Sequence, residues 1–166
     1  VDGQLTLASN GVAIYEWEYD SAGNQTRRAF YGADGQLTLD SNGVAIYESE
    51  YDSAGNVTRR ENYGVDGQLM ANRYGVAIYE WEYDGAGNMT RQENYGADGQ
   101  LTLDSNGIAI YGWEYDSAGN RIRGENYGVD GQLVAANGVA ILEWEYDSAG
   151  NVVETRLYDA QGRLIE

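Results

Sequence analysis

Apolar and acidic residues alternate along a short stretch that recurs throughout the chain. Between positions 76 and 83, aromatic side chains occupy one parity and glutamates the other. These residues are Tyr79, Trp81 and Tyr83 against Glu80 and Glu82. A period of two residues is typical of a half-buried β-strand. The turn-forming run DGAGN, at positions 84–88, then interrupts the alternation. The pattern predicts a strand followed by a tight turn.

The same stretch returns every 32 residues, as the spacing of Asp20, Asp52, Asp84 and Asp116 shows. A fixed period of this size is typical of solenoids and repeat arrays, in which each unit buries its apolar surface against its neighbours. We expect one array of about five copies, approximately residues 1–30, 31–62, 63–94, 95–126 and 127–166, excerpted from a longer protein. The fifth copy is one residue shorter, and we expect that deletion to lie in a turn.

Each period contains three turn signals. In the second copy these are the runs DSAGN at 52–56, GVDGQ at 64–68 and SNG at 41–43. Their glycines suit the left-handed position that closes a three-residue hairpin loop with a bulge, and Asn-Gly is a strong hairpin signal. The sequence therefore predicts an all-β fold, in which antiparallel hairpins or three-stranded meanders stack into an elongated solenoid, spiral or curled sheet.

Three-residue loops also predict which residues face each other across a hairpin. Counting back from the turn places Trp17, Trp81 and Trp113 opposite Arg27, Arg91 and Arg123. The same count sorts the second copy into two faces. One predicted face holds Ala45, Tyr47, Tyr51, Val57, Tyr63, Leu69 and Ala71, and the other holds Val44, Ile46, Glu48, Glu50, Thr58, Arg60 and Asn62. We expect the first face to be dry and aromatic.

Composition and charge narrow the possible chemistry. Ten Lys plus Arg residues stand against 27 Asp plus Glu, which gives a formal net charge of −17. A field of this sign repels nucleic acids and anionic membranes, so we expect no nucleic-acid partner and no membrane insertion. The chain has no Cys, His or Pro, which excludes disulfides, thiol nucleophiles, imidazole bases and Cys/His zinc sites. We expect no cofactor, no metal site and no enzyme activity.

The repeated motif Tyr-Asp-x-x-Gly-Asn, the run EYDSAGNVTRRENYGADGQL and the closing LYDAQGRLIE resemble the YD repeats of Rhs proteins and teneurins. That resemblance implies a spiral β-shell, which in bacteria can enclose a C-terminal toxin and in animals takes part in cell-surface adhesion. The chain departs from the YD pattern in its long period and in the added segment SNGVAIYEWE. The Tyr-x-x-x-Gly spacing is also similar to that of variant MORN repeats.

The aromatic stripe is the first candidate for a binding site. Its members are Tyr15, Trp17, Tyr19, Tyr79, Trp81, Tyr83, Tyr111, Trp113, Tyr115 and Trp144. Such rings could form platforms on which sugar rings stack, but tyrosine ladders more often fill the interior of a repeat protein. We expect the second arrangement. Ser49 replaces the tryptophan in the second copy, so a ligand platform would lose one site there.

Two further sets of residues carry possible chemistry. Pairs of glutamates two residues apart, such as Glu16 with Glu18, could hold Ca²⁺ or act as an acid/base pair. We interpret them as a solvated polar face instead, because no calcium-binding loop motif is present and every candidate is repeated. Three Asn-x-Thr sequons begin at Asn24, Asn56 and Asn88 and mark possible glycosylation sites in a secreted protein.

These observations favour a structural or adhesive segment of a bacterial cell-surface or secreted protein. One alternative is a carbohydrate-binding module that uses the Tyr and Trp platforms. Another is a self-assembling filament or a segment of a toxin-encapsulating YD shell, since open edge strands recruit further strands. The expected partners are accordingly glycans or further copies of the chain, joined edge to edge. The expected location is extracellular or at the cell surface.

Overall fold

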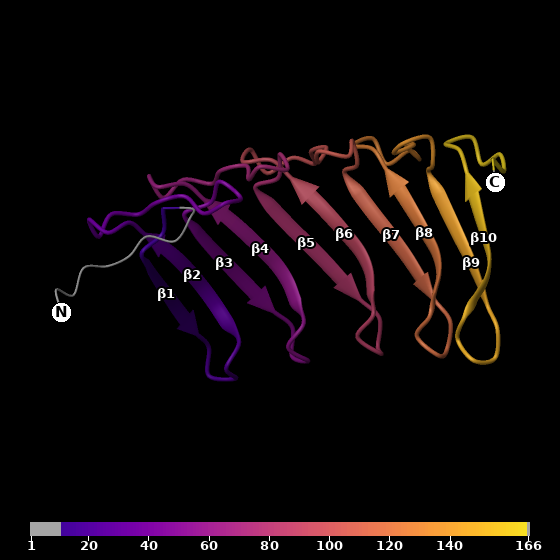
Figure 1. The fold of residues 1–166 in the computed structure, drawn as a ribbon, viewed down its shortest axis with the longest axis horizontal. Helices are drawn as coiled ribbons and strands as arrows, with labels where there is room; N and C mark the ends of the chain where they lie inside the picture. The colour runs from indigo at the N-terminus through magenta and orange to yellow at the C-terminus, as the bar shows by residue number, and fades with distance from the viewer. Residues whose placement is uncertain (1–10, 166) are drawn as a thin grey trace. The chain divides into compact units, whose positions relative to one another are not determined.

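The computed structural model describes residues 11–165 and contains only β-strands and turns in that range. Its ten strands form an antiparallel sheet in which they follow one another in chain order (Figure 1). The strands are β1 (Ile14–Tyr19), β2 (Gln25–Tyr31), β3 (Ile46–Tyr51), β4 (Val57–Tyr63), β5 (Ile78–Tyr83), β6 (Met89–Tyr95), β7 (Ile110–Tyr115), β8 (Arg121–Tyr127), β9 (Ile141–Tyr146) and β10 (Val152–Tyr158). The predicted all-β hairpin architecture is confirmed.

The chain divides into two compact units. The first extends to Tyr79 and includes Tyr95–Gln100, so it holds strands β1 to β4. The second comprises Glu80–Asn94 and Leu101–Glu166, and it holds strands β7 to β10 with most of the β5–β6 hairpin. Each unit therefore contains several copies of the repeat.

All three turns of a period have the same backbone geometry. At the tip of the β3–β4 hairpin, Asp52 N donates to Asn56 O at 2.9 Å and Gly55 N donates to Asp52 O at 3.1 Å. The other two turns of the period repeat these two bonds, between Gly64 and Gln68 and between Asp40 and Val44. The third loop residue is in each case a glycine with positive φ: Gly43 (80°), Gly55 (87°) and Gly67 (72°). The predicted three-residue loops are confirmed.

The one-residue deletion of the fifth copy lies in a turn, as predicted. Ala136 and Val139 exchange two backbone hydrogen bonds, which leaves only Asn137 and Gly138 in the loop. Both have positive φ, 52° and 88°, as a two-residue type I′ turn requires. Loss of one residue thus converts a three-residue loop into the tighter Asn-Gly hairpin and leaves the flanking strands paired.

The predicted register is wrong beyond the first pair of the β1–β2, β3–β4, β7–β8 and β9–β10 hairpins. Tyr51 faces Val57 as expected, but a β-bulge follows, so that Glu50 faces Arg59 and Ser49 faces Arg60. Equivalent bulges place Trp17 opposite Arg28 and Trp113 opposite Gly124, in place of the predicted Arg27 and Arg123. The bulge inserts one residue into β4, and a shift of one residue moves every later side chain to the other face.

The two faces of the first unit are corrected accordingly. Tyr47, Ser49 and Tyr51 of β3 share a face with Arg60 and Asn62 of β4, which the sequence analysis placed on the opposite side. We call this side the aromatic face. Tyr63 lies instead on the side of the glutamates, where its hydroxyl donates to Glu61 Oε2 at 2.5 Å. We call that side the carboxylate face.

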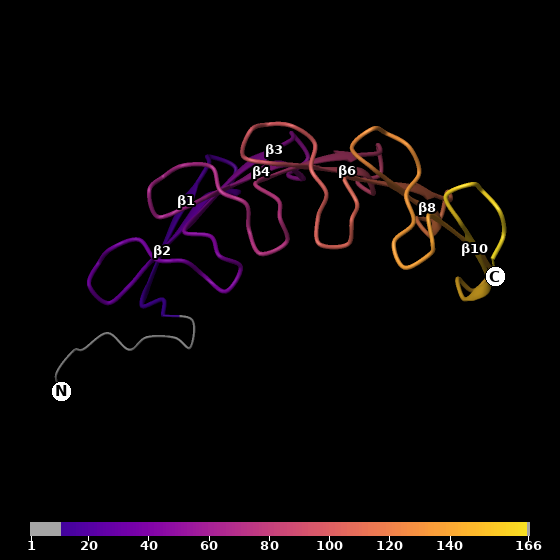
Figure 2. The same cartoon turned by 90° about the horizontal axis from the view of Figure 1, so that it is seen from above.

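The apolar core is a band at the start of strands β3, β5, β7 and β9 rather than the aromatic face. Val44, Ala45 and Ile46 are all nearly inaccessible to solvent, and the same holds for Val76, Ala77 and Ile78. Consecutive residues of a strand point to opposite sides, so both sides must be covered here. The loops of each connection provide that cover, and Figure 2 shows them projecting to both sides of the sheet. Leu37, Tyr31 and Tyr63 pack against this band in the first unit.

Candidate binding faces of the sheet

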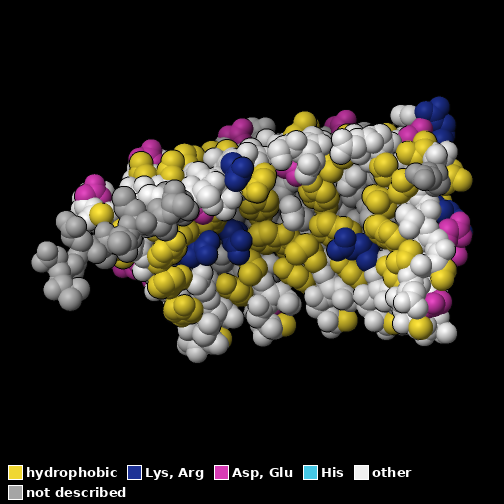
Figure 3. All heavy atoms as spheres, viewed as in Figure 1, with side chains coloured by type: hydrophobic (Ala, Val, Ile, Leu, Met, Phe, Trp, Pro, Cys, Tyr) yellow, Lys and Arg dark blue, Asp and Glu magenta, His cyan; other side chains and the backbone are white. Residues whose placement is uncertain are grey.

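The aromatic face is partly open to solvent. Figure 3 views a face of the molecule on which hydrophobic side chains gather over the strands with basic groups among them. Trp17 is 47% exposed and Tyr19 59% exposed, whereas Trp81, Trp113 and Trp144 are half-buried. The expected dry aromatic interior is therefore not present at these rings within the described residues.

Neighbouring rings of one strand stack on each other. Tyr15 and Trp17 lie with ring centroids 5.8 Å apart and an interplanar angle of 10°, and Tyr111 and Trp113 repeat the arrangement at 5.7 Å and 3°. Tyr79 and Trp81 occupy the equivalent positions on β5. The exposed side of an aromatic ring can be covered by a sugar ring or by another aromatic group. The geometry permits either use.

The last tyrosines of β3 and β9 have a structural role that the sequence did not reveal. Tyr51 Oη donates to Gln25 O at 2.7 Å, and Tyr146 Oη donates to Arg121 O at 2.8 Å. In both cases the acceptor belongs to the preceding hairpin. The ladder between β2 and β3 covers only the three pairs from Arg27–Glu48 to Ala29–Ile46. The tyrosine hydroxyl thus bonds a carbonyl that lies beyond the end of that ladder.

A buried asparagine joins consecutive copies. Asn62 and Asn94 are both 0% exposed. Asn62 Nδ2 donates to Val76 O at 3.0 Å, and Asn94 Nδ2 donates to Ile108 O at 3.2 Å. Asn126 makes the same contact with Val139 O at 3.3 Å. The recurring Glu-Asn-Tyr triplet was the available sequence signal, but the predicted register placed the asparagine on a solvated face.

The second and third copies differ in how they satisfy that asparagine. In the third copy Trp81 Nε1 donates to Gln92 Oε1 at 3.0 Å, and Gln92 Nε2 donates to Asn94 Oδ1 at 2.9 Å. In the second copy the corresponding residues are Ser49 and Arg60, and Arg60 Nε is directed at Ser49 Oγ, 3.4 Å away. Asn62 Oδ1 is consequently buried without a hydrogen-bond partner.

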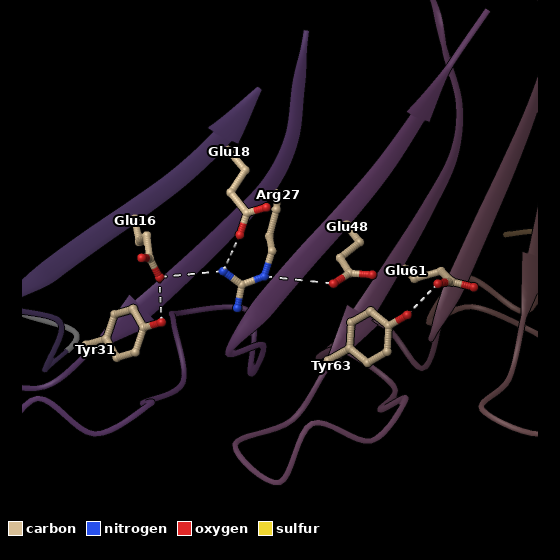
Figure 4. A network of polar contacts seen from close by, with 7 residues as sticks. All are labelled: Glu16, Glu18, Arg27, Tyr31, Glu48, Glu61 and Tyr63. Atoms are coloured by element: carbon tan, nitrogen blue, oxygen red, sulfur yellow. Dashed lines mark hydrogen bonds and ion pairs between the residues drawn. The ribbon is translucent and has the colours of Figure 1, made fainter. Parts of the chain in front are cut away.

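The carboxylate face is a network of arginines, glutamates and tyrosines (Figure 4). Arg27 lies 3.5 Å from Glu16, 3.2 Å from Glu18 and 3.8 Å from Glu48 of the next hairpin. Tyr31 Oη donates to Glu16 Oε2 at 2.6 Å. In the second unit Arg123 pairs with both Glu125 and Glu143. These arginines connect glutamates on neighbouring strands.

Electrostatics on the carboxylate face follows from these contacts. Burial and the bond donated to Glu125 raise the pKa of Tyr127 to about 12. The pKa of Glu61 is lowered although burial opposes this, because Tyr63 and Arg59 donate to the carboxylate. Within residues 11–165 no group of three or more acidic side chains could hold a metal ion. The glutamates Glu16, Glu18, Glu143 and Glu145 are instead all engaged with arginines.

The sequon asparagines lie at the tips of the hairpins. Asn24, Asn56 and Asn88 each donate Nδ2 to the aspartate four residues earlier, at 2.9 Å in every case. The amide nitrogen that would carry a glycan therefore already closes the turn. Glycosylation at these positions stays a prediction.

Comparison with known proteins gives structural matches alone. No family model matches the chain, and no curated protein matches it. The solved structures that match include the Tc holotoxin pore of Photorhabdus luminescens with a TccC3 substitution, with TM-score 0.49 and 16% identity over 90% of this chain and 8% of that one. They also include TcdB2–TccC3, with TM-score 0.38 and 17% identity over 90% and 8%. The chain thus spans less than a tenth of the length of these toxin-complex proteins.

In residues 11–165 no helix is long and apolar enough to cross a membrane.

Proposed function

We propose that the chain is a non-enzymatic structural segment of a secreted or cell-surface protein, in which the repeated residues join one hairpin to the next. The observation that supports this proposal is that the recurring hydrogen bonds link each copy or hairpin to its neighbour. Asn62, Asn94 and Asn126 each bond a carbonyl of the following copy, and Tyr51 and Tyr146 each bond a carbonyl of the preceding hairpin. The residues repeated for these contacts therefore hold the hairpins of the array together.

The charged residues support the same proposal. Arg27 contacts Glu48, and Arg123 contacts Glu143, so that each arginine reaches the next hairpin. Catalysis requires a unique set of groups in one place, whereas these sets recur along the chain. A wall built from such hairpins could enclose or display another domain, as the resemblance to YD repeats implies. We propose an extracellular location on the same ground.

A carbohydrate-binding module is the second candidate, because the stacked Tyr15–Trp17 and Tyr111–Trp113 pairs lie on a partly open face. A single variant separates the two functions. For Trp113→Ala the structural proposal expects a loss of about 2 kcal/mol in the free energy of unfolding, roughly half of the ~3–5 kcal/mol typical of a fully buried ring. The more exposed Trp17→Ala is the matched control and should cost less.

Urea unfolding followed by circular dichroism measures both variants, and a glycan array measures binding by the unmodified chain. If the chain is a structural segment, no glycan should bind the parent chain and fail to bind both variants. The scaffold proposal is wrong, and the binding module is correct, if Trp113→Ala unfolds at the same urea concentration as the parent chain but no longer binds a glycan that the parent binds.

A further inference from the structure

The aromatic face of the first unit has a hollow at the position where other copies carry a tryptophan. Ser49 occupies this position in β3, between Tyr47 and Tyr51 of the same strand. The hollow has a volume of about 160 Å³, and its other lining residues are Gln25, Arg27, Arg28 and Arg60 of the flanking strands. Because a serine side chain is far smaller than an indole, the substitution leaves part of the space unfilled.

The shape of this space follows from the other copies. In the first copy the indole of Trp17 stacks parallel to Tyr15, and in the fourth copy Trp113 stacks parallel to Tyr111. Tyr47 is the equivalent tyrosine in the second copy, and its strand supplies no ring to stack on it. By comparison with those two pairs, whose centroids are 5.7–5.8 Å apart, the group that the second copy lacks is a flat aromatic ring, and guanidinium groups lie over Tyr47 instead.

Two arginines lie beside the tyrosine ring that borders the hollow. The guanidinium carbon of Arg28 lies 4.9 Å from the Tyr47 ring centroid, and that of Arg60 lies 5.9 Å from it. Within the described residues Arg28 forms no ion pair, and its Nε is buried without a hydrogen-bond partner. The strands β1 to β4 direct their glutamates to the opposite, carboxylate face. The carboxylate of Asp40 accepts a hydrogen bond from Tyr47 Oη at 2.9 Å.

We propose that this hollow binds an aromatic carboxylate, such as the C-terminal aromatic residue of a peptide. The ring would occupy the place of the missing indole against Tyr47, and the carboxylate would lie between the guanidinium groups of Arg28 and Arg60. Guanidinium groups bind carboxylates through paired hydrogen bonds, which gives both affinity and orientation. A single carboxylate suits the site better than a polyanion, because the net charge of −17 repels extended anions.

The test uses three small probes with the intact chain. N-acetyltryptophan supplies ring and carboxylate, N-acetyltryptophanamide supplies the ring alone, and acetate supplies the carboxylate alone. Dissociation constants are measured by ligand-observed NMR. The proposal expects N-acetyltryptophan to bind at least tenfold more tightly than either of the other probes. Equal affinity for the amide, or equal affinity for acetate, would overturn it.

Three variants locate the binding. Ser49→Trp fills the hollow and should abolish binding, and Arg28→Gln should weaken the carboxylate probe by at least fivefold without changing the affinity of the amide. Arg59→Gln is the matched control, because Arg59 lies on the carboxylate face and pairs with Glu61. Unchanged circular dichroism establishes that each variant is folded. Binding that survives Ser49→Trp, or that falls equally in Arg59→Gln, places the probe elsewhere and refutes the proposal.

Discussion

Replacement of Arg60 by glutamine should make the protein more stable, although it removes a charged residue from a repeat with many ion pairs. In the third copy the equivalent Gln92 donates to Asn94 Oδ1 at 2.9 Å. In the second copy Arg60 replaces that glutamine, and Asn62 Oδ1 is buried without a partner. Arg60→Gln supplies the missing donor in the geometry that the third copy already adopts.

The magnitude follows from two opposing contributions. A buried acceptor without a hydrogen bond costs roughly 1–3 kcal/mol, which the new amide donor removes. The substitution also removes the cation–π contact between Arg60 and Tyr47, worth about 0.5–1 kcal/mol at a solvent-exposed site. We expect a net gain of about 1 kcal/mol, equivalent to a rise in Tm of roughly 2–4 °C for a chain of this size.

Urea unfolding monitored by circular dichroism and by tryptophan fluorescence gives the free energy of unfolding, and coincident transitions establish two-state behaviour. The reciprocal variant Gln92→Arg is the control. It loses the hydrogen bonds to both Trp81 Nε1 and Asn94 Oδ1 and should destabilise the chain by about 1–3 kcal/mol. If Arg60→Gln is destabilising while Gln92→Arg is neutral, the role assigned to the glutamine is wrong.

Two further predictions concern the hairpin ends. Tyr51→Phe removes the hydrogen bond to Gln25 O and should lower the free energy of unfolding, measured in urea, by about 0.5–1.5 kcal/mol. Tyr19→Phe is the control at an exposed site and should change the free energy of unfolding by less than about 0.5 kcal/mol. Equal losses in the two variants would contradict the role of Tyr51 between hairpins. The side chain of Asn56 and, to a smaller extent, its backbone N–H donate to Asp52 and lower the pKa of that carboxyl below its ordinary value of 3.8. The stability that Asp52 contributes is therefore present above about pH 4. It is lost as the pH falls through the pKa of Asp52 in the folded state. Asn56→Ala should raise the pKa of Asp52 in an NMR titration and leave that of Asp84 unchanged, because Asp84 keeps its own Asn88; a pKa of Asp52 that does not move would refute the assigned cause.

Local features were predictable from the sequence. The period, the strands and the three turns follow from the two-residue alternation and from glycines at positions that require positive φ, such as Gly55 and Gly67. The shortened turn at Asn137 was also foreseeable as a deletion within a loop. These features depend on a few adjacent residues, so the chain specifies them without reference to distant contacts.

The faces of the even-numbered strands required the tertiary structure. One extra residue at the bulge before Arg59 reverses the side on which Arg60, Asn62 and Tyr63 lie, and no local signal marks it. The core also differs from expectation, because loops cover both sides of Val44, Ala45 and Ile46 while the aromatic rings remain partly exposed. Consequently the buried asparagines and the hollow at Ser49 were not predicted. The sequence determined the hairpins, and the packing of one hairpin against the next decided which residues are buried, because burial depends on register and on cover from distant segments.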